Sequence, residues 1–290
     1  MADHDPGIAS AAAVEGPRTW LVTGASRGLG RAFVEAALGA GDAVAATARD
    51  ARTLAGLVGR FPDRALALDL DVTDHDAARE VAARVAERFG RLDVVVNNAG
   101  YGLHGAVEGV TEAEARAQLE MNFFGALWVT QAVLPYMRRQ GSGHVVQVCS
   151  AAGAVGFALV GMYSASKFAL EGMSECLARE VAPFGVKVTI LEPSDFRTGF
   201  RDRAAKRRRP LPAYEEAFGA NLDALSARHS GSEAGDPARA ARALLALVDE
   251  AEPPLRLLLG NMAFDVVTSA QRRRLEEWAA QEAVARAADG

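Results

Sequence analysis

The sequence predicts an α/β protein with one doubly wound domain, in which helices cover both faces of a seven-stranded parallel sheet. Three observations lead to this prediction. Short runs of Val, Leu, Ile and Ala, typical of strands buried on both faces, alternate with longer amphipathic stretches. A Gly-rich turn joins the first run to the first helical stretch. No linker divides the 290 residues, a length near the upper limit for one hydrophobic core.

The predicted strands and helices alternate along the chain. Strands are expected at 20–23, 43–47, 65–69, 94–97, 144–149, 186–191 and 255–259. Helices are expected at 28–40, 50–59, 74–90, 111–139, 161–183 and 236–250, with a terminal helix at 261–287. Asp74, and Thr111 followed by Glu114, have the pattern of helix caps. Functional residues are expected after the carboxyl ends of the strands, where open α/β sheets bind ligands.

Two segments fall outside this alternation. Residues 1–17 are small, polar or Gly/Pro, so we expect a flexible tail before a domain that spans 18–290. The stretch 193–235 is too long for a simple crossover and is predicted to be a substrate lid. An apolar substrate cleft is expected from aromatic and aliphatic residues of the lid and nearby loops: Phe196, Phe200, Tyr214, Phe218, Phe157, Leu159 and Leu103.

Composition and charge exclude several classes of protein. No apolar run reaches the roughly 20 residues of a membrane span, and the N-terminus lacks the features of a signal peptide, so a cytoplasmic protein is expected. The net charge of -5 opposes binding to polyanions, so nucleic acid is not an expected partner. Cys149 and Cys176 are interpreted as core thiols, with neither a disulfide nor a metal site.

The first candidate site is the Gly-rich turn Thr23–Gly30. Gly24 permits a tight turn, Gly28 lets backbone N–H groups approach a pyrophosphate, and Gly30 allows close packing of helix and strand. The other residues expected to bind the cofactor in this turn are Ser26, Arg27 and Leu29. The position between a buried strand and a helix favours a dinucleotide site of the Rossmann type over a plain turn.

The end of the second strand predicts which dinucleotide binds. A site for NAD(H) normally carries a carboxylate there for the ribose 2′-hydroxyl. This strand instead ends in Arg49, and the Gly-rich turn carries Arg27. Two guanidinium groups would pair with a 2′-phosphate, so NADP(H) is favoured over NAD(H). The alternative is that both arginines are solvated surface charges.

The third and fourth strands are followed by further candidate residues. Asp71, next to Val72, is placed either to accept a hydrogen bond from an adenine amino group or to cap the following helix. Asn97 is expected to brace neighbouring strands. The remaining cofactor candidates in this loop, which leave room for the ribose and nicotinamide, are Asn98, Ala99 and Gly100.

Tyr163 and Lys167 are the candidate catalytic pair. They are four residues apart on a predicted helix and therefore share one face. A free phenol has a pKa of about 10. A neighbouring ammonium lowers this pKa toward neutrality. Ser150, at the end of the preceding strand, is placed to hydrogen-bond a carbonyl oxygen. The alternative, a packed Tyr, a solvated Lys and a capping Ser, does not explain why all three converge on the Gly-rich turn.

In these motifs the chain resembles the short-chain dehydrogenases/reductases, across essentially everything after residue 18. The matching motifs are, in order, Thr23-Gly24…Gly28…Gly30, Asp71-Val72, Asn97–Gly100, Ser150 and Tyr163…Lys167. The resemblance implies that a nicotinamide gives hydride to a carbonyl carbon while Tyr163 protonates the oxygen. It adds Asn122 as the holder of a proton-relay water, and Pro193 and Thr198 as nicotinamide contacts. It also implies that Lys167 and Tyr163 contact the cofactor.

The resemblance has finer implications and two departures. Chain length, Arg49 and the segment 253–260 look most like a 17β-hydroxysteroid-dehydrogenase-like branch, and a homodimer or homotetramer is implied. Ser194 stands where the family usually has Gly after Pro193, which reduces the backbone freedom expected there. Gln147 and Cys149 stand where Asn and Ser are common, a change expected to affect packing rather than chemistry.

Three functions from different classes remain open at this point. The first is an NADPH-dependent ketoreductase for a bulky apolar ketone, or the reverse alcohol oxidation by the same residues. The second is a redox-sensing regulator that binds NADP(H) without turnover. Such a protein would have no use for an activated phenol. The third is a nucleic-acid-binding protein using the tract Lys206–Arg209, which the negative net charge disfavours.

Overall fold

The computed structural model describes residues 16–200, 206–207, 211–214, 216–218 and 234–289. Most of the expected tail and about half of the expected lid therefore lie outside the described residues. The main elements in chain order are β1 (Thr19–Val22), α1 (Gly28–Gly39), β2 (Ala43–Ala48), α2 (Ala55–Arg60), β3 (Ala65–Asp69), α3 (His75–Phe89), β4 (Val94–Asn97), α4 (Glu112–Leu119), α5 (Gly125–Gln140), β6 (Gly143–Val148), α7 (Gly161–Val181), β7 (Val186–Pro193), α9 (Pro237–Asp249), β9 (Arg256–Leu259) and α10 (Asn261–Ala280).

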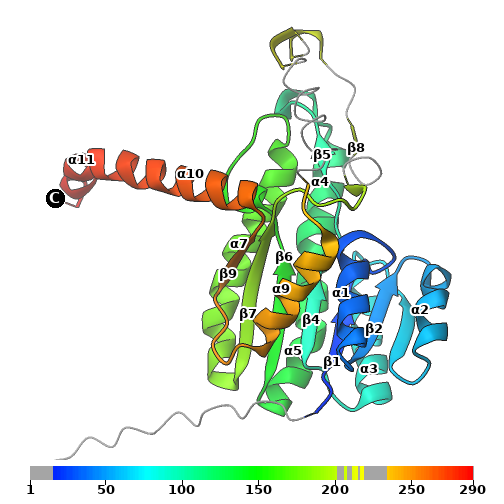
Figure 1. Cartoon of the computed structure of the whole chain (residues 1–290). Helices are drawn as coiled ribbons and strands as arrows, with labels where there is room; N and C mark the ends of the chain where they lie inside the picture. Colours follow the sequence, from blue (N-terminus) through cyan, green and yellow to red (C-terminus); the bar gives the residue numbers. More distant parts are fainter. Residues whose placement is uncertain (1–15, 201–205, 208–210, 215, 219–233, 290) are drawn as a thin grey trace, which may run out of the picture.

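The sheet has seven parallel strands in the order β3-β2-β1-β4-β6-β7-β9, as Figure 1 shows in the body of the molecule. This confirms the predicted fold class and places every predicted strand within two residues of its observed ends. The chain runs outward from β1 to β3 and then returns to add β4 on the other side of β1. The carboxyl ends of β1 and β4 therefore form the point where the strand order reverses, and ligands bind there in such sheets.

Each face of the sheet is covered by its own hydrophobic core. Along β1, Trp20 and Val22 pack into one core with residues of α1 and α9, whereas Leu21 packs into the other with residues of α3, α5 and α7. Successive side chains of a strand point to opposite faces, so a strand buried on both sides needs apolar residues at every position. This requirement explains the continuous apolar runs of the sequence.

The structure departs from the predicted elements in four places. The expected helix 111–139 is interrupted between α4 and α5 by a π-helical turn, η3 (Glu120–Phe124). The terminal helix ends at Ala280 and resumes as α11 (Glu282–Ala287). Two short elements were not expected: α6 (Ala151–Ala154), and a second sheet in which β5 (Leu103–His104) pairs with β8 (Lys206–Arg207). These pieces are too short to leave a periodic pattern. The predicted caps of α3 and α4 are confirmed, since Asp74 accepts from two backbone N–H groups and Thr111 forms a capping box with Glu114.

The two cysteines differ in burial. Cys149 is buried as expected, but the interpretation of Cys176 as a core thiol is wrong, because α7 exposes this residue. An amphipathic pattern leaves the edge of a buried face uncertain by one residue, and Cys176 falls beyond that edge.

Within the residues that the structure describes, no helix is both long enough and apolar enough to span a bilayer.

Behind α7 lies a cluster of buried carboxyl groups. Glu192 of β7 and Glu171 of α7 are 1% and 7% exposed, and both face Arg256 of β9. The Arg256 Nε atom is 3.1 Å from Glu171 Oε2 and 3.9 Å from Glu192 Oε1. The Arg256 Nη2 atom is 2.7 Å from Oε2 of the more exposed Glu175. Burial, together with the neighbouring Glu171 carboxylate, raises the pKa of Glu192 to about 8. Glu192 is therefore mostly protonated at neutral pH.

Replacing Glu192 with Gln should remove a pH-dependent loss of stability. Between the ordinary pKa of 4.5 and about 8, the folded chain keeps a proton at Glu192 that the unfolded chain has released. The free energy of unfolding therefore falls as pH rises through this window, by an amount on the order of a few kcal/mol at about 1.4 kcal/mol per pKa unit. Glu192→Gln stays neutral, so we expect it to match the wild type at pH 5 and to exceed its stability at pH 8.

Urea unfolding at several pH values would measure this difference. The matched control is Glu175→Gln. Because Arg256 lowers the pKa of Glu175, removing the Glu175 carboxylate should not raise the free energy of unfolding at pH 8. Parallel stability curves for wild type and Glu192→Gln would contradict the assignment.

Candidate active site

The Gly-rich turn between β1 and α1 is held from two sides. The N–H of Ala25 donates to the carbonyl of Thr47 at the end of β2, at 2.8 Å, and the N–H of Thr23 donates to Val96 of β4, at 3.0 Å. The Asn98 side-chain amide donates to the carbonyls of Thr23 and Gly24, at 2.9 and 3.2 Å. The turn therefore lies fixed at the point where the strand order reverses.

The glycines of this turn leave a backbone cradle that side chains would fill. Gly24 adopts φ +64°, which L-residues rarely occupy. A Cβ at Gly30 would collide with the Asn98 side chain and lie 2.6 Å from the Gly24 carbonyl oxygen. Thr198, on the loop that follows Pro193, lies over Gly28, where a Cβ would be 3.2 Å from the Thr198 Cβ. The structure thus brings two separately predicted cofactor segments together. In the same turn, Ser26 and Leu29 are half-buried.

Arg27 and Arg49 lie at the exposed ends of this region. Both side chains are exposed, one at the N-terminus of α1 and one directly after β2. Neither guanidinium makes a hydrogen bond or ion pair within the described part of the chain. The nearest carboxylate in sequence, Asp50, is engaged by Arg52 through two hydrogen bonds of 2.9 Å. Two unpaired positive charges are therefore available to an anion here.

The loops after β3 and β4 show which polar groups are already used. Asp71 accepts from the N–H and hydroxyl of Thr73, at 3.0 and 2.8 Å, so one carboxylate oxygen stabilises the turn ahead of α3. The adjacent Val72 is buried, with its side chain against Gly125 of α5. Asn97 donates to Gln147 and Thr130, which fits the expected brace between β4, β6 and α5. Gln147 thus acts in packing, as predicted.

Gly100 connects this loop to the candidate catalytic residues. A Cβ at Gly100 would lie 3.0 Å from the Asn122 Oδ1 atom and 3.9 Å from the Lys167 Nζ atom. A larger residue would therefore crowd Asn122 and come into van der Waals contact with Lys167. Ala99 stands next to it, and its N–H donates to the Thr23 hydroxyl at 3.0 Å. The structure brings the two halves of the predicted site into contact at this loop.

Lys167 is the buried cation of the site. It is 5% exposed, and its ammonium donates to the carbonyl oxygen of Val148 at 2.8 Å. Burial lowers its pKa, since desolvation penalises the charged form. Val148 is the last residue of β6, so this bond ties α7 to the strand that leads to Ser150.

Ser150 and Tyr163 lie at the starts of two packed helices. Ser150 is the N-cap of α6, and its hydroxyl accepts from the Ala152 N–H at 3.1 Å. Tyr163 lies in the first turn of α7, one turn before Lys167, and is partly exposed. Its ring centroid is 6.3 Å from that of Phe200. Cys149, between Val148 and Ser150, is buried, and this raises the pKa of its thiol well above the ordinary range.

Asn122 lies in the π-helical turn η3, where its amide is fully used. Its Oδ1 accepts from the Tyr101 N–H at 3.1 Å, and its Nδ2 donates to the Tyr101 carbonyl at 2.9 Å and to the Ser166 hydroxyl at 3.1 Å. The Ser166 hydroxyl donates in turn to the Tyr163 carbonyl. Such turns are rare and often occur at functional sites. Sequence periodicity did not indicate the turn, or the contribution of Ser166.

The loop after β7 packs against neighbouring segments. Ser194 has no positive φ, and its side chain lies against Gly260. Phe196 is half-buried and packs against Gly235 and the core beside α1 and α9, and its expected place in the cleft stays a prediction. The remaining cleft residues differ in exposure. Leu103 is buried in β5, whereas Tyr214 stacks on Phe218 and donates to Glu108 at 2.9 Å.

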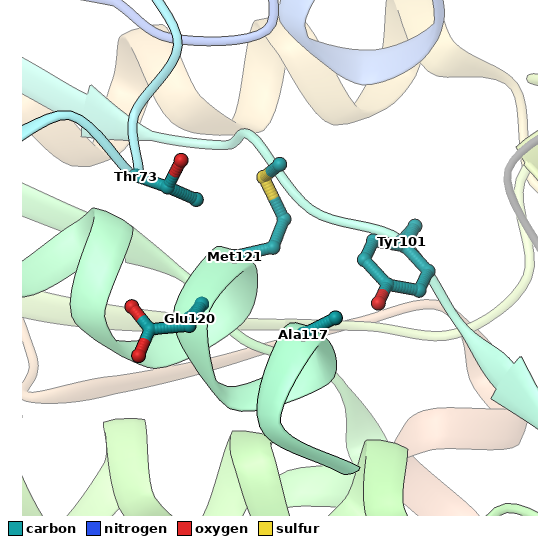
Figure 2. Close-up of a pocket in the computed structure, with 5 residues that line it drawn as sticks. All are labelled: Thr73, Tyr101, Ala117, Glu120 and Met121. Carbon is teal, nitrogen blue, oxygen red and sulfur yellow. The ribbon is translucent and has the colours of Figure 1, made fainter. Parts of the chain in front are cut away.

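A cavity of about 430 Å³ adjoins the site on the side of the π-helical turn. Figure 2 shows Met121 and Tyr101 pointing into the region between the loops that follow β3 and β4. The lining residues are Thr73, Tyr101, Ala117, Glu120 and Met121. Thr73 follows Asp71 and Val72, and Met121 precedes Asn122. The cavity therefore borders two predicted parts of the site, and the sequence pattern had not indicated it.

Comparisons with known proteins agree with this geometry. The family model for short chain dehydrogenases matches residues 18–209. The chain is 42% identical over 249 residues to oxidoreductase BOA17 of Botryotinia fuckeliana, which covers 86% of this chain and 90% of that protein. It is 35% identical over 248 residues to a 3-ketodihydrosphingosine reductase of Bacteroides thetaiotaomicron, with 85% and 89% covered.

Solved structures show the same fold. A short-chain dehydrogenase from Streptomyces avermitilis superposes with a TM-score of 0.88 and 47% identity, covering 95% of this chain and 99% of that one. A short chain dehydrogenase from Burkholderia cenocepacia, solved in complex with NADP, has a TM-score of 0.72 and 26% identity, with 91% and 96% covered. The chain therefore belongs to the short-chain dehydrogenase/reductase family and is an oxidoreductase that uses a nicotinamide cofactor on a small-molecule substrate.

Proposed function

We propose that this protein uses NADPH to reduce a bulky apolar ketone to a secondary alcohol, or catalyses the reverse oxidation, with Tyr163 as the acid or base. The observation that carries the proposal is the contact at Gly100, where the cofactor loop meets the Lys167 ammonium and the Asn122 amide. A pure NADP(H) sensor would have no need of a buried cation one turn from a phenol.

The cradle fits a dinucleotide. The backbone of Gly24, Gly28 and Gly30 would hold the pyrophosphate at the N-terminus of α1, where the helix dipole and free N–H groups favour an anion. Arg27 and Arg49 would pair with the 2′-phosphate of NADP(H). Asp71, Val72 and the cavity beside Met121 would receive the adenine end. When bound, the cofactor supplies or accepts the hydride.

Four residues would transfer the proton of the reaction or position the groups around it. Lys167 stays desolvated while the Val148 carbonyl satisfies its ammonium, and a desolvated cation acts strongly on a neighbouring phenol. Tyr163 would donate its proton to the carbonyl oxygen, and Ser150 would hydrogen-bond the same oxygen as negative charge develops. Asn122 would keep η3 and the Tyr101 backbone in place beside Lys167.

The surroundings of Tyr163 favour an apolar substrate. The Phe200 ring lies beside the Tyr163 ring and is still 37% exposed, so a substrate at Tyr163 would contact it. The relative from Bacteroides thetaiotaomicron is named for reduction of a keto group, which supports a ketone here. The expected 17β-hydroxysteroid-dehydrogenase-like branch and cytoplasmic location remain predictions.

Tyr163→Phe should lower turnover about 10²- to 10⁴-fold, the usual contribution of a general acid or base, while cofactor affinity changes little. The physical reason is that the ring is kept and only the titrating hydroxyl is lost. Steady-state kinetics and NADPH titration would separate the two effects. The matched control is Tyr136→Phe on α5, where Tyr136 lies under Arg139. Turnover near that of the control would exclude Tyr163 as the proton donor.

Arg49→Ala should lower kcat/KM for NADPH more than tenfold and leave the value for NADH almost unchanged. A hydrogen bond to a charged group contributes about 1.5–3 kcal/mol, roughly a 10- to 100-fold effect. The matched control is Arg52→Ala, which removes an exposed arginine of the next turn that is paired with Asp50. An equal loss with both cofactors would show that Arg49 does not recognise the 2′-phosphate.

A panel of ketones would test the substrate class directly. NADPH consumption can be followed by the absorbance of the cofactor at roughly 340 nm. It should be fastest with aromatic, steroid or long-chain ketones. Phe200→Ala should raise KM for these compounds because it removes an apolar contact beside Tyr163. Fast turnover of small polar sugars, unaffected by Phe200→Ala, would be incompatible with an apolar site.

A further inference from the structure

His104 is a half-buried residue of β5 to which the reaction described above gives no role. Its imidazole lies over Gly102, because a Cβ at Gly102 would be 3.4 Å from the His104 Nε2 atom. The same point is 3.4 Å from the Cε1 atom of Phe200, whose ring centroid is 6.3 Å from that of Tyr163. The His104 and Phe200 rings are therefore neighbours, and Tyr163 borders the same Phe200 ring.

The glycines of the stretch 100–104 show which side of the chain His104 occupies. A Cβ at Gly100 would be 3.9 Å from the Lys167 Nζ atom. The intervening Tyr101 instead lines the cavity that Figure 2 shows. The even-numbered residues of this stretch therefore share the side of the candidate catalytic groups, and His104 is the polar residue among them.

The backbone that carries His104 is held against the start of α7. The Gly105 N–H donates to the Leu159 carbonyl at 2.7 Å, and Gly105 forms a parallel bridge with Val160, three residues before Tyr163. Leu159 has a φ of +64°, the one positive φ of a non-glycine residue in the described part of the chain. Such a backbone persists where the surrounding contacts impose it, and it is frequent at ligand sites. His104 is therefore fixed relative to Tyr163.

We propose that His104 is a specificity-determining residue, whose imidazole donates a hydrogen bond to a second oxygen of the substrate. The neutral ring carries one N–H and the protonated ring two, so it can donate in either form. Because His104 and Tyr163 both border the single Phe200 ring, the two substrate oxygens are only a few bonds apart. A largely apolar cleft with one polar group fixes the orientation of an otherwise apolar ligand.

This inference rests on the proposed ketone reduction and narrows its substrate class. The class becomes apolar ketones with a nearby acceptor oxygen, such as β-keto esters and β-diketones. A site built around a hydrogen bond discriminates against analogues that lack the matching group.

Two ketones of matched length separate the hydrogen bond from apolar contacts. Ethyl benzoylacetate and hexanophenone are both phenyl ketones with tails of the same length, and only the ester has a second carbonyl oxygen. His104→Phe should raise KM for ethyl benzoylacetate roughly three- to tenfold, the effect of one neutral hydrogen bond. Its kcat should change little, because the bond exists both before and during the reduction. KM for hexanophenone should not rise.

Comparison of each variant with the wild type cancels the different intrinsic reactivity of the two ketones. His104→Gln keeps a donor and should retain most of the preference for the ester. The matched control is His75→Phe on α3, a half-buried histidine edge-on to Trp128, which should leave both KM values unchanged. Tm and NADPH affinity show whether each variant is folded.

The inference is overturned if His104→Phe affects both ketones equally or neither. It is also overturned if His104→Gln loses as much as His104→Phe, because ring packing and not a hydrogen bond would then set the preference. A wild-type protein that reduces neither ketone would overturn the proposed function and this inference with it. Reduction of both ketones with no effect of His104 would overturn the inference alone.

Discussion

The hydrogen bond from the Lys167 ammonium to the Val148 carbonyl is the interaction on which the geometry of the site depends. A buried cation needs a partner, and here the partner is the last residue of a central strand. The bond joins α7 to β6, and therefore joins the helix that carries Tyr163 to the strand that leads to Ser150. The two candidate groups that would act on one carbonyl oxygen are thus linked through this contact, together with the bond from the Cys149 thiol to the Lys167 carbonyl.

A second constraint fixes the cofactor side relative to this pair. Asn98 and Thr23 connect the Gly-rich turn to the end of β4, and Gly100, two residues after Asn98, lies against Asn122 and Lys167. A shift of the turn would therefore be felt at the lysine through a few backbone atoms. The missing Cβ atoms at Gly30 and Gly100 are structural requirements, because side chains there would collide with Asn98 or press on Asn122.

The sequence predicted the strands well because burial on both faces demands an apolar residue at every position, as in Trp20, Leu21 and Val22. Ordered motifs predicted that the loops of the site meet at the carboxyl edge of the sheet, and the structure places Thr198 over Gly28. Periodicity could not indicate the π-helical turn at Asn122, since a turn of 5 residues is too short to have a period of its own. Nor could it indicate the contacts of single aromatic side chains, such as that of Phe196 with Gly235. Such contacts depend on neighbours distant in sequence.

Two buried ionisable groups packed around α7, Lys167 on the helix and Glu192 on β7, meet opposite electrostatic problems. Burial pushes both Lys167 and Glu192, which lies beside Glu171, toward their neutral forms. Lys167 has a carbonyl oxygen as its partner, which favours the ammonium, whereas Glu192 has another carboxylate, which favours the protonated acid. Arg256 offsets part of the remaining negative charge from the β9 side. The side of α7 facing the cofactor loop therefore presents a cation, and the carboxyl groups behind it keep a proton that limits their opposing field.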